Sequence, residues 1–273
     1  RIACRIAGRG ECPRHGTDLR RGGRMTDDID AITREGTTDI YLMLDFDGTL
    51  IDLAPTPDGI HVPGRLHGLL AGLHAKLDGR LCLVSGREVA VLERFLPDFP
   101  GDIFGAHGAE ARRGGTLSRH PLVGSPVVAD VQSQAQDAVA QMHGVTLETK
   151  DTGAVIHYRA VPQAEGAARA AAETIAAAAP GMEMHTSKMA FEIRPSDASK
   201  AGAVHAIIAE QPSGIRPVVI GDDVTDEEAM VVANAAGGFA VRVGGGDTCA
   251  AYRLPNPAAV LALLESWLSE ETL

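Results

Sequence analysis

The sequence is poor in aromatic residues and cysteine and lacks long apolar runs. Each of these shortages excludes some kinds of protein. Aromatic residues make up 4% of the 273 residues, so the core must be packed mainly with aliphatic side chains. The four cysteines, Cys4, Cys12, Cys82 and Cys249, show neither CxxC spacing nor the density of a secreted disulfide scaffold. No run of 18 apolar residues is present, so the sequence predicts no membrane-spanning helix.

Basic residues are also in short supply, with 25 Lys and Arg against 36 Asp and Glu and a formal net charge of −11. Binding to nucleic acid requires clustered Lys and Arg, and the sequence shows no such stripe with interleaved aromatics. We therefore expect neither a nucleic acid nor a membrane as partner. An anionic substrate would need a local cation to overcome the negative field of the protein.

The first 24 residues differ from the rest, because they carry seven Arg against Glu11 and Asp18. They lack the apolar segment of a secretory signal, so we expect a cytoplasmic protein. An Arg-rich targeting segment and an upstream extension before a natural start at Met25 are both compatible with this composition. We expect residues 1–35 to be a disordered extension.

Short apolar strands alternate with helical patterns in two separate parts of the chain. This alternation predicts a parallel sheet with helices on both faces, an α/β core domain formed by residues 36–108 and 199–273. The expected strands are 40–44, 81–84, 103–105, 217–220 and 239–243, and the expected helices are 65–77, 88–95, 200–210, 226–234 and 257–269.

Residues 109–198 between these parts have a different pattern. Strands 146–150 and 154–159 are joined by Asp-Thr-Gly, which is typical of a hairpin. The segment therefore predicts an α+β domain inserted into the core. Its other expected elements are helices 127–142 and 163–178 and strands 182–185 and 189–193.

Two carboxylates, Asp45 and Asp47, follow the first apolar strand and project to the same side of an extended chain. Gly48 permits a tight turn there, and ligands bind at the carboxyl ends of parallel strands. One carboxylate could attack phosphorus while its neighbour transfers protons. Taken alone, the motif is equally compatible with a strand that ends in solvated acids.

A second acidic motif, residues 221–227 (GDDVTDE), follows another buried strand. Helix capping accounts for one or two of its acids but not for four acids in six positions. Carboxylate oxygens at a strand end are typical ligands of Mg²⁺. The motif therefore predicts a metal site.

Two weaker signals lie at strand-to-helix junctions. Ser85 and the backbone after it could hold phosphoryl oxygens, although a Ser before a helix is more often a cap. Lys200 opens a helix, where a positive charge opposes the helix dipole, and this indicates an anion nearby. Alone, each signal is also compatible with an ordinary cap or a surface lysine.

Together, the four motifs and their order resemble the haloacid-dehalogenase superfamily. The resemblance implies that Asp45 is the nucleophile, which forms an aspartyl-phosphate, and that Asp47 protonates the leaving oxygen and then activates water. It implies Mg²⁺ as cofactor, on the Asp45 carboxylate, the Asp47 carbonyl and Asp222. It also implies that Ser85 and Lys200 hold the phosphoryl oxygens.

Within that superfamily, six segments between Asp39 and Trp267 are similar to the trehalose-6-phosphate phosphatase family. The resemblance implies a Rossmann-like haloacid-dehalogenase core with a parallel sheet, plus an inserted α+β cap domain. It also implies hydrolysis of trehalose 6-phosphate, the final step of trehalose biosynthesis. The segments are 44–60 (LDFDGTLIDLAPTPDGI), 85–87 (SGR), 105–110 (GAHGAE), 147–159 (LETKDTGAVIHYR), 188–195 (KMAFEIRP) and 218–230 (VVIGDDVTDEEAM).

The same resemblance implies that Glu148, Lys150 and Glu192 hydrogen-bond sugar hydroxyls. The other residues that it implies for substrate binding are Arg87, His107 and Arg194. On residue pattern alone, Glu148 and Lys150 are equally compatible with ion pairs on an exposed sheet, and His107 with a core histidine. The sequence departs from the family at Ala201, where a Gly usually follows the Lys, and this would shift the phosphate site slightly.

Two other functions stay open at this point. One is a phosphatase of another sugar phosphate, such as sucrose 6-phosphate or mannosyl-3-phosphoglycerate. The other is a non-catalytic regulatory partner of a trehalose-phosphate synthase, although such proteins usually lose the catalytic acids. We expect a monomer that binds a small sugar phosphate, with the insert closing over the core to select the substrate.

Overall fold

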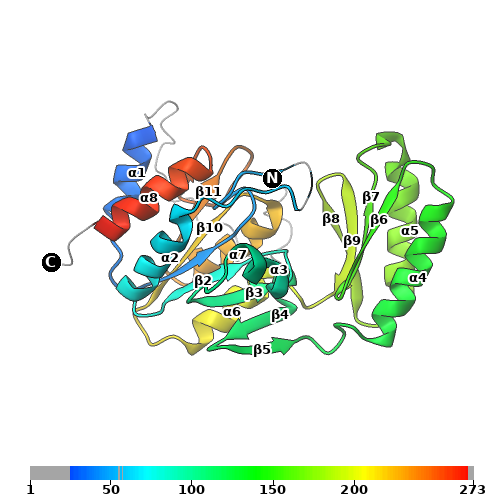
Figure 1. The fold of residues 1–273 in the computed structure, drawn as a ribbon, viewed down its shortest axis with the longest axis horizontal. Helices are drawn as coiled ribbons and strands as arrows, with labels where there is room; N and C mark the ends of the chain where they lie inside the picture. Colours follow the sequence, from blue (N-terminus) through cyan, green and yellow to red (C-terminus); the bar gives the residue numbers. More distant parts are fainter. Residues whose placement is uncertain (1–24, 55, 57, 270–273) are drawn as a thin grey trace. The chain divides into compact units, whose positions relative to one another are not determined.

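The computed structural model describes residues 25–54, 56 and 58–269, so the Arg-rich segment 1–24 lies outside the described residues. The chain divides into two compact units (Figure 1). The core unit contains the described residues up to Thr116 together with those from Lys200 onwards, and the inserted unit is Leu117–Ser199.

The core unit is built on a largely parallel sheet with the strand order β12-β11-β10-β1-β2-β3-β4-β5. The pairs from β12 to β3 are parallel, and β4 turns back antiparallel to β3. The chain passes from one unit to the other within β5. The strands are β1 (Ile40–Leu44), β2 (Leu81–Val84), β3 (Asp102–Gly105), β4 (Glu110–Arg113), β5 (Thr116–Arg119), β10 (Arg216–Gly221), β11 (Phe239–Val243) and β12 (Tyr252–Leu254).

Two helix layers cover this sheet because alternate strand side chains point to opposite faces. Leu42 and Leu44 of β1 pack in one apolar cluster with α2 (Arg65–Lys76), α3 (Val89–Phe95) and α8 (Pro257–Ser269). Tyr41 and Met43 of the same strand pack in another, with α6 (Lys200–Glu210) and α7 (Val224–Ala235). The α/β fold class expected from the sequence is confirmed. Burial on both faces explains why β1 appears in the sequence as an unbroken apolar run.

The structure differs from the sequence expectation at both borders of the first core segment. Residues 25–33 form α1 (Met25–Thr33), whose Ile32 is fully buried in the core, so the expected disorder of residues 1–35 is corrected for this stretch. The expected insert began at residue 109, but β4 pairs with β3 and keeps residues 109–116 in the core unit. Neither segment has an unbroken apolar run like those of β1 and β2.

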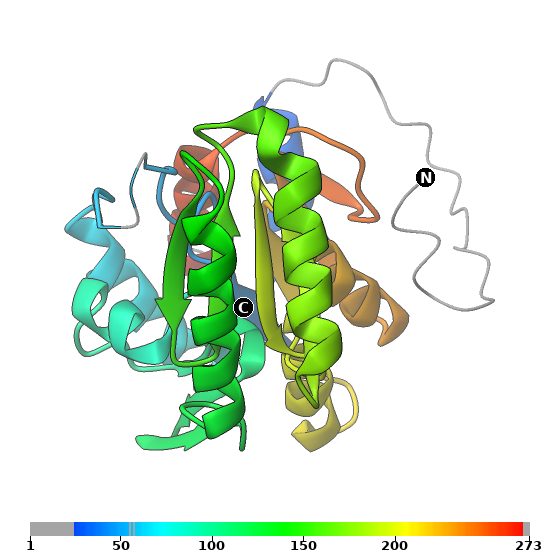
Figure 2. The same ribbon diagram turned by 90° about the vertical axis from the view of Figure 1, so that its right-hand side faces the viewer.

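The inserted unit is a four-stranded antiparallel sheet with the order β6-β7-β9-β8 and two helices on one face. Figure 2 shows these helices running side by side in front of the sheet. The unit is thus the α+β domain that the sequence predicts. Its elements are α4 (Pro126–Ala140), β6 (Thr146–Lys150), β7 (Gly153–His157), α5 (Glu165–Ala178), β8 (Met182–Ser187) and β9 (Ala190–Pro195).

Among the described residues, no helix has both the length and the apolar character needed to cross a membrane.

Candidate active site

The carboxylate of Asp45 is held by donors on both of its oxygens at the end of β1. Oδ1 accepts a hydrogen bond from Lys200 Nζ at 2.6 Å, and Oδ2 accepts one from the Thr49 hydroxyl at 3.3 Å. Asp45 follows five buried strand residues and is itself 5% exposed. The side chain predicted to be the nucleophile is therefore buried and fixed in orientation.

Lys200 connects two carboxylates that are far apart in the sequence. It is the first residue of α6, is 4% exposed, and donates to Asp226 Oδ1 at 2.7 Å as well as to Asp45. Burial alone would lower the pKa of Lys200, but the charges of Asp226 and Asp45 raise it above its ordinary value. The ammonium group thus stays charged at the position where the sequence indicated an anion.

Asp222, in the loop after β10, lies against the turn that follows β1. A Cβ atom added to Gly48 would overlap the Asp222 carboxylate, and Gly48 has a φ of +75°. Glycine is therefore required here for both backbone conformation and close approach. Carboxylate oxygens of Asp45, Asp222 and Asp226 lie within 4.8 Å of one another. The two acids expected to share a cation are thus brought together.

This cluster carries more negative than positive charge, because three carboxylates face one ammonium group. Burial, followed by repulsion from Asp226, raises the pKa of Asp45 well above its ordinary value. Burial, Asp226 and Asp223 raise the pKa of Asp222 to about 6. A positive charge among these oxygens would relieve the repulsion that contributes to both shifts.

The donor set fits a divalent cation with a preference for oxygen ligands. Asp226 already uses Oδ1 for Lys200 and Oδ2 for the backbone N–H groups of Asp222 and Asp223, at 3.2 and 3.0 Å. Asp45 and Asp222 keep more of their acceptor capacity. Mg²⁺ typically takes only one or two carboxylates and completes its shell with water, and these two acids match that requirement.

Asp47, two residues beyond Asp45, forms a two-pronged ion pair with Arg87. Arg87 donates from Nε to Oδ2 at 2.5 Å and from Nη2 to Oδ1 at 2.7 Å. The guanidinium group also lies 5.4 Å from the ring centre of Phe95 and 5.9 Å from that of Phe46. The two residues were predicted as proton carrier and substrate ligand, and the structure places them in direct contact.

Ser85 and His107 belong to two segments that are hydrogen-bonded to each other. Ser85 is 1% exposed and its hydroxyl accepts the N–H of Arg87 at 3.2 Å. The backbone N–H of His107 donates to the Ser85 carbonyl at 2.9 Å. Ala106 and His107 both have positive φ, of 48° and 57°, a conformation that costs non-glycine residues about 1–3 kcal/mol each.

The His107 ring packs directly on the glycine of the Ser-Gly-Arg motif. A Cβ atom on Gly86 would stand 2.7 Å from His107 Nε2, so a side chain at this position would displace the imidazole. The strained turn at residues 106–107 brings the imidazole to this position. Strain of this kind is typical of functional sites, where the surroundings hold an unfavourable backbone in place.

The remaining predicted residues lie in the inserted unit, on the face of its sheet opposite the helices. Strand register puts Glu148, Lys150 and Glu192 on this face, whereas Ile156 and Phe191 pack towards α4 and α5. Lys150 Nζ donates to Glu192 Oε1 at 2.9 Å, and Glu148 Oε2 lies 2.8 Å from His157 Nε2. The hydrogen bond from His157 is the largest cause of a lowered pKa at Glu148.

Arg194 lies on the same face and is 3% exposed. It donates to the Ala198 carbonyl, and its Nη2 lies 3.2 Å from His185 Nδ1. Its Nε lies 3.9 Å from Glu192 Oε2. In this structure Arg194 therefore places a positive charge beside Glu192.

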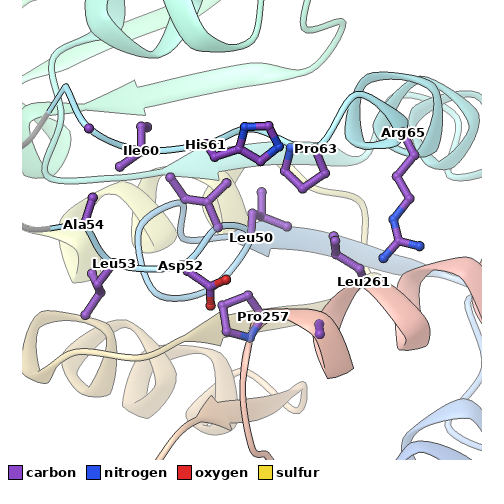
Figure 3. Close-up of a pocket in the computed structure, with 13 residues that line it drawn as sticks. Leu50, Asp52, Leu53, Ala54, Ile60, His61, Pro63, Arg65, Pro257 and Leu261 are labelled. Carbon is purple, nitrogen blue, oxygen red and sulfur yellow. The ribbon is translucent and has the colours of Figure 1, made fainter.

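A cavity of about 400 Å³ lies in the core unit beside the loop that follows β1 (Figure 3). Its wall combines this loop with the first turn of α8, including Asp52, His61, Pro257 and Leu261. None of the described residues predicted to be catalytic lines it, so the cavity is separate from the carboxylate cluster.

Four residues at or beside the cluster had no individual role predicted from the sequence: Thr49, Asp226, Arg242 and Glu227. Asp226 and Glu227 are among the four acids of the second motif, and that excess of acids is the available signal. Thr49 and Arg242 are recognised only by their contacts. Arg242 lies within the buried strand β11 and contacts the loop of the second motif, a pairing that no local pattern in the sequence indicates.

Comparisons with known proteins agree with one another. The family model described as trehalose-phosphatase matches residues 43–254. Trehalose-6-phosphate phosphatase of Escherichia coli (strain K12) is 36% identical over 222 residues, which cover 81% of this chain and 84% of that protein. Probable trehalose-phosphate phosphatase of Sinorhizobium fredii (strain NBRC 101917 / NGR234) is 37% identical over 205 residues, covering 74% and 77%.

A solved structure gives the same fold. The C-terminal domain of C. albicans trehalose-6-phosphate phosphatase superposes with a TM-score of 0.74 at 20% identity, over 90% of this chain and 97% of that one. At this identity the likeness supports the fold alone.

Proposed function

Because the chain belongs to the trehalose-phosphatase family, we propose that it hydrolyses trehalose 6-phosphate to trehalose and phosphate. In a biosynthetic route this is the final step to trehalose. The observation that carries the proposal is the buried Asp45 carboxylate, grouped with Asp222 and Asp226 around the ammonium of Lys200. Nucleophile, cation ligands and a fixed positive charge are the parts that phosphoryl transfer requires.

In the proposed reaction an Asp45 oxygen attacks phosphorus and the bond from phosphorus to the sugar oxygen breaks. Asp47 gives a proton to that leaving oxygen, which departs as a trehalose hydroxyl. Asp47 then takes a proton from a water molecule that attacks the aspartyl-phosphate, and the products are phosphate and free Asp45. Ser85 and Lys200 hold the phosphoryl oxygens throughout.

This sequence of steps requires Asp47 to leave its ion pair with Arg87, since both carboxylate oxygens are engaged there. Arg87 contacts a residue only two positions from the nucleophile, so it can take a phosphoryl oxygen in exchange. We therefore assign Arg87 to substrate binding, where a guanidinium fork suits a phosphate group.

We further propose that Mg²⁺ is held by the carboxylates of Asp45 and Asp222 and the backbone carbonyl of Asp47. When bound, the ion offsets negative charge on the transferring phosphoryl group.

Sugar recognition is assigned to the inserted unit, with Glu148, Lys150 and Glu192 hydrogen-bonding hydroxyls, supported by Arg194. Paired acids and an amine suit vicinal diols, and their mutual pairing limits the cost of desolvation. His107 is assigned to substrate binding from the core. Its strained backbone and its place on Gly86 support that role.

Phosphate release from a panel of sugar phosphates, with and without Mg²⁺, tests the proposal. Trehalose 6-phosphate should be hydrolysed with the highest kcat/KM, chelation should abolish release, and added Mg²⁺ should restore it. A preference for sucrose 6-phosphate or mannosyl-3-phosphoglycerate would overturn the substrate. Absence of phosphate release from every compound would instead favour the regulatory alternative.

A monomeric state and a cytoplasmic location complete the proposal. Light scattering of the purified chain tests the first, and fractionation of cells that express it tests the second.

A further inference from the structure

A buried arginine lies directly behind the loop that carries Asp222. Arg242 on β11 is the register partner of Gly221, the residue before Asp222, because β10 and β11 pair in parallel. Its Nη1 donates to the backbone carbonyl of Asp223 at 2.9 Å and to Glu227 Oε1 at 3.2 Å. At 9% exposed, the arginine is largely removed from water, so its acceptors in the chain fix its position.

Glu227, in the first turn of α7, extends this contact to a third segment. Its second oxygen, Oε2, accepts the backbone N–H of Cys249 at 2.9 Å. Arg242 Nη2 in turn donates to the carbonyl of Gly245 at 3.4 Å. One buried ion pair therefore connects the loop after β10, the start of α7 and the segment after β11.

We propose that Arg242, together with Glu227, is a positioning residue for the cation site. Through the Asp223 carbonyl it fixes the backbone next to Asp222, so that the Asp222 carboxylate faces Asp45. Charge-assisted hydrogen bonds are short and directional, which suits this task. The inference rests on the proposed function, because it concerns the affinity of the Mg²⁺ site described there.

Stability alone gives no clear reason for a buried ion pair at this position. Buried ion pairs often stabilise a fold no better than apolar residues of similar volume, because both charges lose their hydration. In this chain the pair hydrogen-bonds the backbone of Asp223, Gly245 and Cys249. Groups that orient a metal ligand in this way typically alter metal affinity about 10- to 100-fold when they are changed.

The chain offers a control with the same kinds of acceptor in Arg216, on the neighbouring strand β10, where the ion pair is about a third exposed. Arg216 also contacts one carboxylate and one carbonyl, Glu35 Oε2 at 3.1 Å and the Glu35 backbone oxygen at 2.8 Å. It lies at the first residue of β10, the opposite end from Asp222. Loss of Arg216 should therefore destabilise the core without reaching the cation site.

Calorimetric titration of the substrate-free full chain with Mg²⁺ tests the inference on Arg242→Gln and Arg216→Gln. The dissociation constant for Mg²⁺ should rise about tenfold or more in Arg242→Gln and stay at the wild-type value in Arg216→Gln. At saturating Mg²⁺, kcat of Arg242→Gln should return close to wild type, since the residue does not contact the reacting groups.

If Arg242→Gln does not fold, the same titration is made on two milder variants, Arg242→Lys and Glu227→Gln. Lysine retains the charge but not the two-acceptor fork, so its dissociation constant should lie between wild type and Arg242→Gln. Equal Mg²⁺ affinity in wild type and in every folded variant would overturn the inference while leaving the proposed function intact. A wild-type protein that binds no Mg²⁺ but hydrolyses trehalose 6-phosphate would overturn it together with the metal role.

Discussion

The charged residues assigned to catalysis in the core unit and those assigned to sugar binding in the inserted unit are arranged differently. In the core unit, three carboxylates and Lys200 lie in a cluster where Asp45, Lys200 and Asp226 are each at most 5% exposed. In the inserted unit, Lys150 with Glu192 and His157 with Glu148 form pairs, and the second pair leaves more than a third of each side chain in water. The core cluster holds more carboxylates than cationic groups, whereas each of these two carboxylates in the insert has a partner of its own.

This difference agrees with the proposal that the core unit performs phosphoryl transfer and the inserted unit recognises the sugar. An uncompensated, buried cluster is costly to the fold and is retained where a cation and a phosphoryl group supply the missing interactions. Side chains that are already paired can exchange their partners for sugar hydroxyls. We therefore expect changes in the core to affect hydrolysis of every phosphate ester, and changes in the insert to affect only the preferred sugar.

The largest effect should follow from Asp45→Asn. An amide cannot attack phosphorus, so kcat should fall by about 10⁴-fold or more for trehalose 6-phosphate and equally for p-nitrophenyl phosphate. Phosphate release measures the first and absorbance the second. Asp58→Asn is the control and should keep full activity. Asp58 is an exposed acid in the loop after β1, and it pairs with Arg94 of α3. Retention of activity on either ester by Asp45→Asn would refute the proposed mechanism.

Much of the fold follows from local sequence pattern. Buried strands such as β1 and β2 are unbroken apolar runs, and the sequence predicts their bounds to the residue. The strands β4, β5 and β12 were not predicted. Residues 110–113 read EARR and 116–119 read TLSR, which carry no apolar run, and their strand conformation depends on pairing with neighbours in the sheet.

The site was predictable only where one residue type is unusual in its context. Asp45 and Asp222 follow strands, and Lys200 opposes a helix dipole, so each is marked as a candidate. Their roles were predicted only from the four motifs taken together, because each signal alone is also compatible with a cap or a surface charge. Contacts between distant segments leave no such signal in the sequence. The fork between Arg87 and Asp47 joins residues 40 apart, and the position of Arg242 behind Asp222 depends on strand register.

A second prediction, for Gly48→Ala, tests whether activity requires the close approach of Asp222 to the turn after β1. Gly48→Ala places a methyl group against the Asp222 carboxylate and forces a residue with a side chain to adopt a φ of +75°. We expect kcat/KM to fall about 10²-fold for both esters, because misplacement of about 1 Å in an active site has that effect.

Gly36→Ala separates backbone strain from contact with Asp222. Gly36 has a φ of +71°, but nothing lies within 4 Å of a Cβ atom added there. This control should lower the melting temperature without a change in kcat/KM. Equal activity losses in the two variants would attribute the effect of Gly48→Ala to strain alone.

A substitution in the inserted unit should affect hydrolysis of trehalose 6-phosphate but not of a phosphate ester without a sugar. Glu192→Gln removes the charged partner of Lys150 and weakens one proposed acceptor of a sugar hydroxyl, so kcat/KM for trehalose 6-phosphate should fall about 10- to 100-fold. Hydrolysis of p-nitrophenyl phosphate, which has no sugar, should be unchanged. Glu173→Gln on the exposed surface of α5 is the control and should change neither rate. An equal loss of kcat/KM on both esters in Glu192→Gln would contradict the assignment of sugar recognition to the inserted unit.

The smallest effect concerns stability of the insert at the pair of Glu148 and His157. Because both side chains are more than a third exposed, Glu148→Gln should lower the free energy of unfolding by less than about 0.5 kcal/mol at neutral pH. The hydrogen bond from His157 is the main cause of the lowered folded-state pKa of Glu148. The contribution is therefore present above the ordinary value of 4.5 and is lost as the pH falls through the folded-state pKa.

Urea unfolding of wild type and Glu148→Gln at a series of pH values measures this difference. The two curves should converge in acid and separate slightly above pH 4.5. A penalty of several kcal/mol at neutral pH would show that Glu148 supports the fold as the buried core acids do. A small penalty combined with a loss of kcat/KM for trehalose 6-phosphate alone would assign the pair to recognition, because a residue that matters little to stability then matters to one substrate.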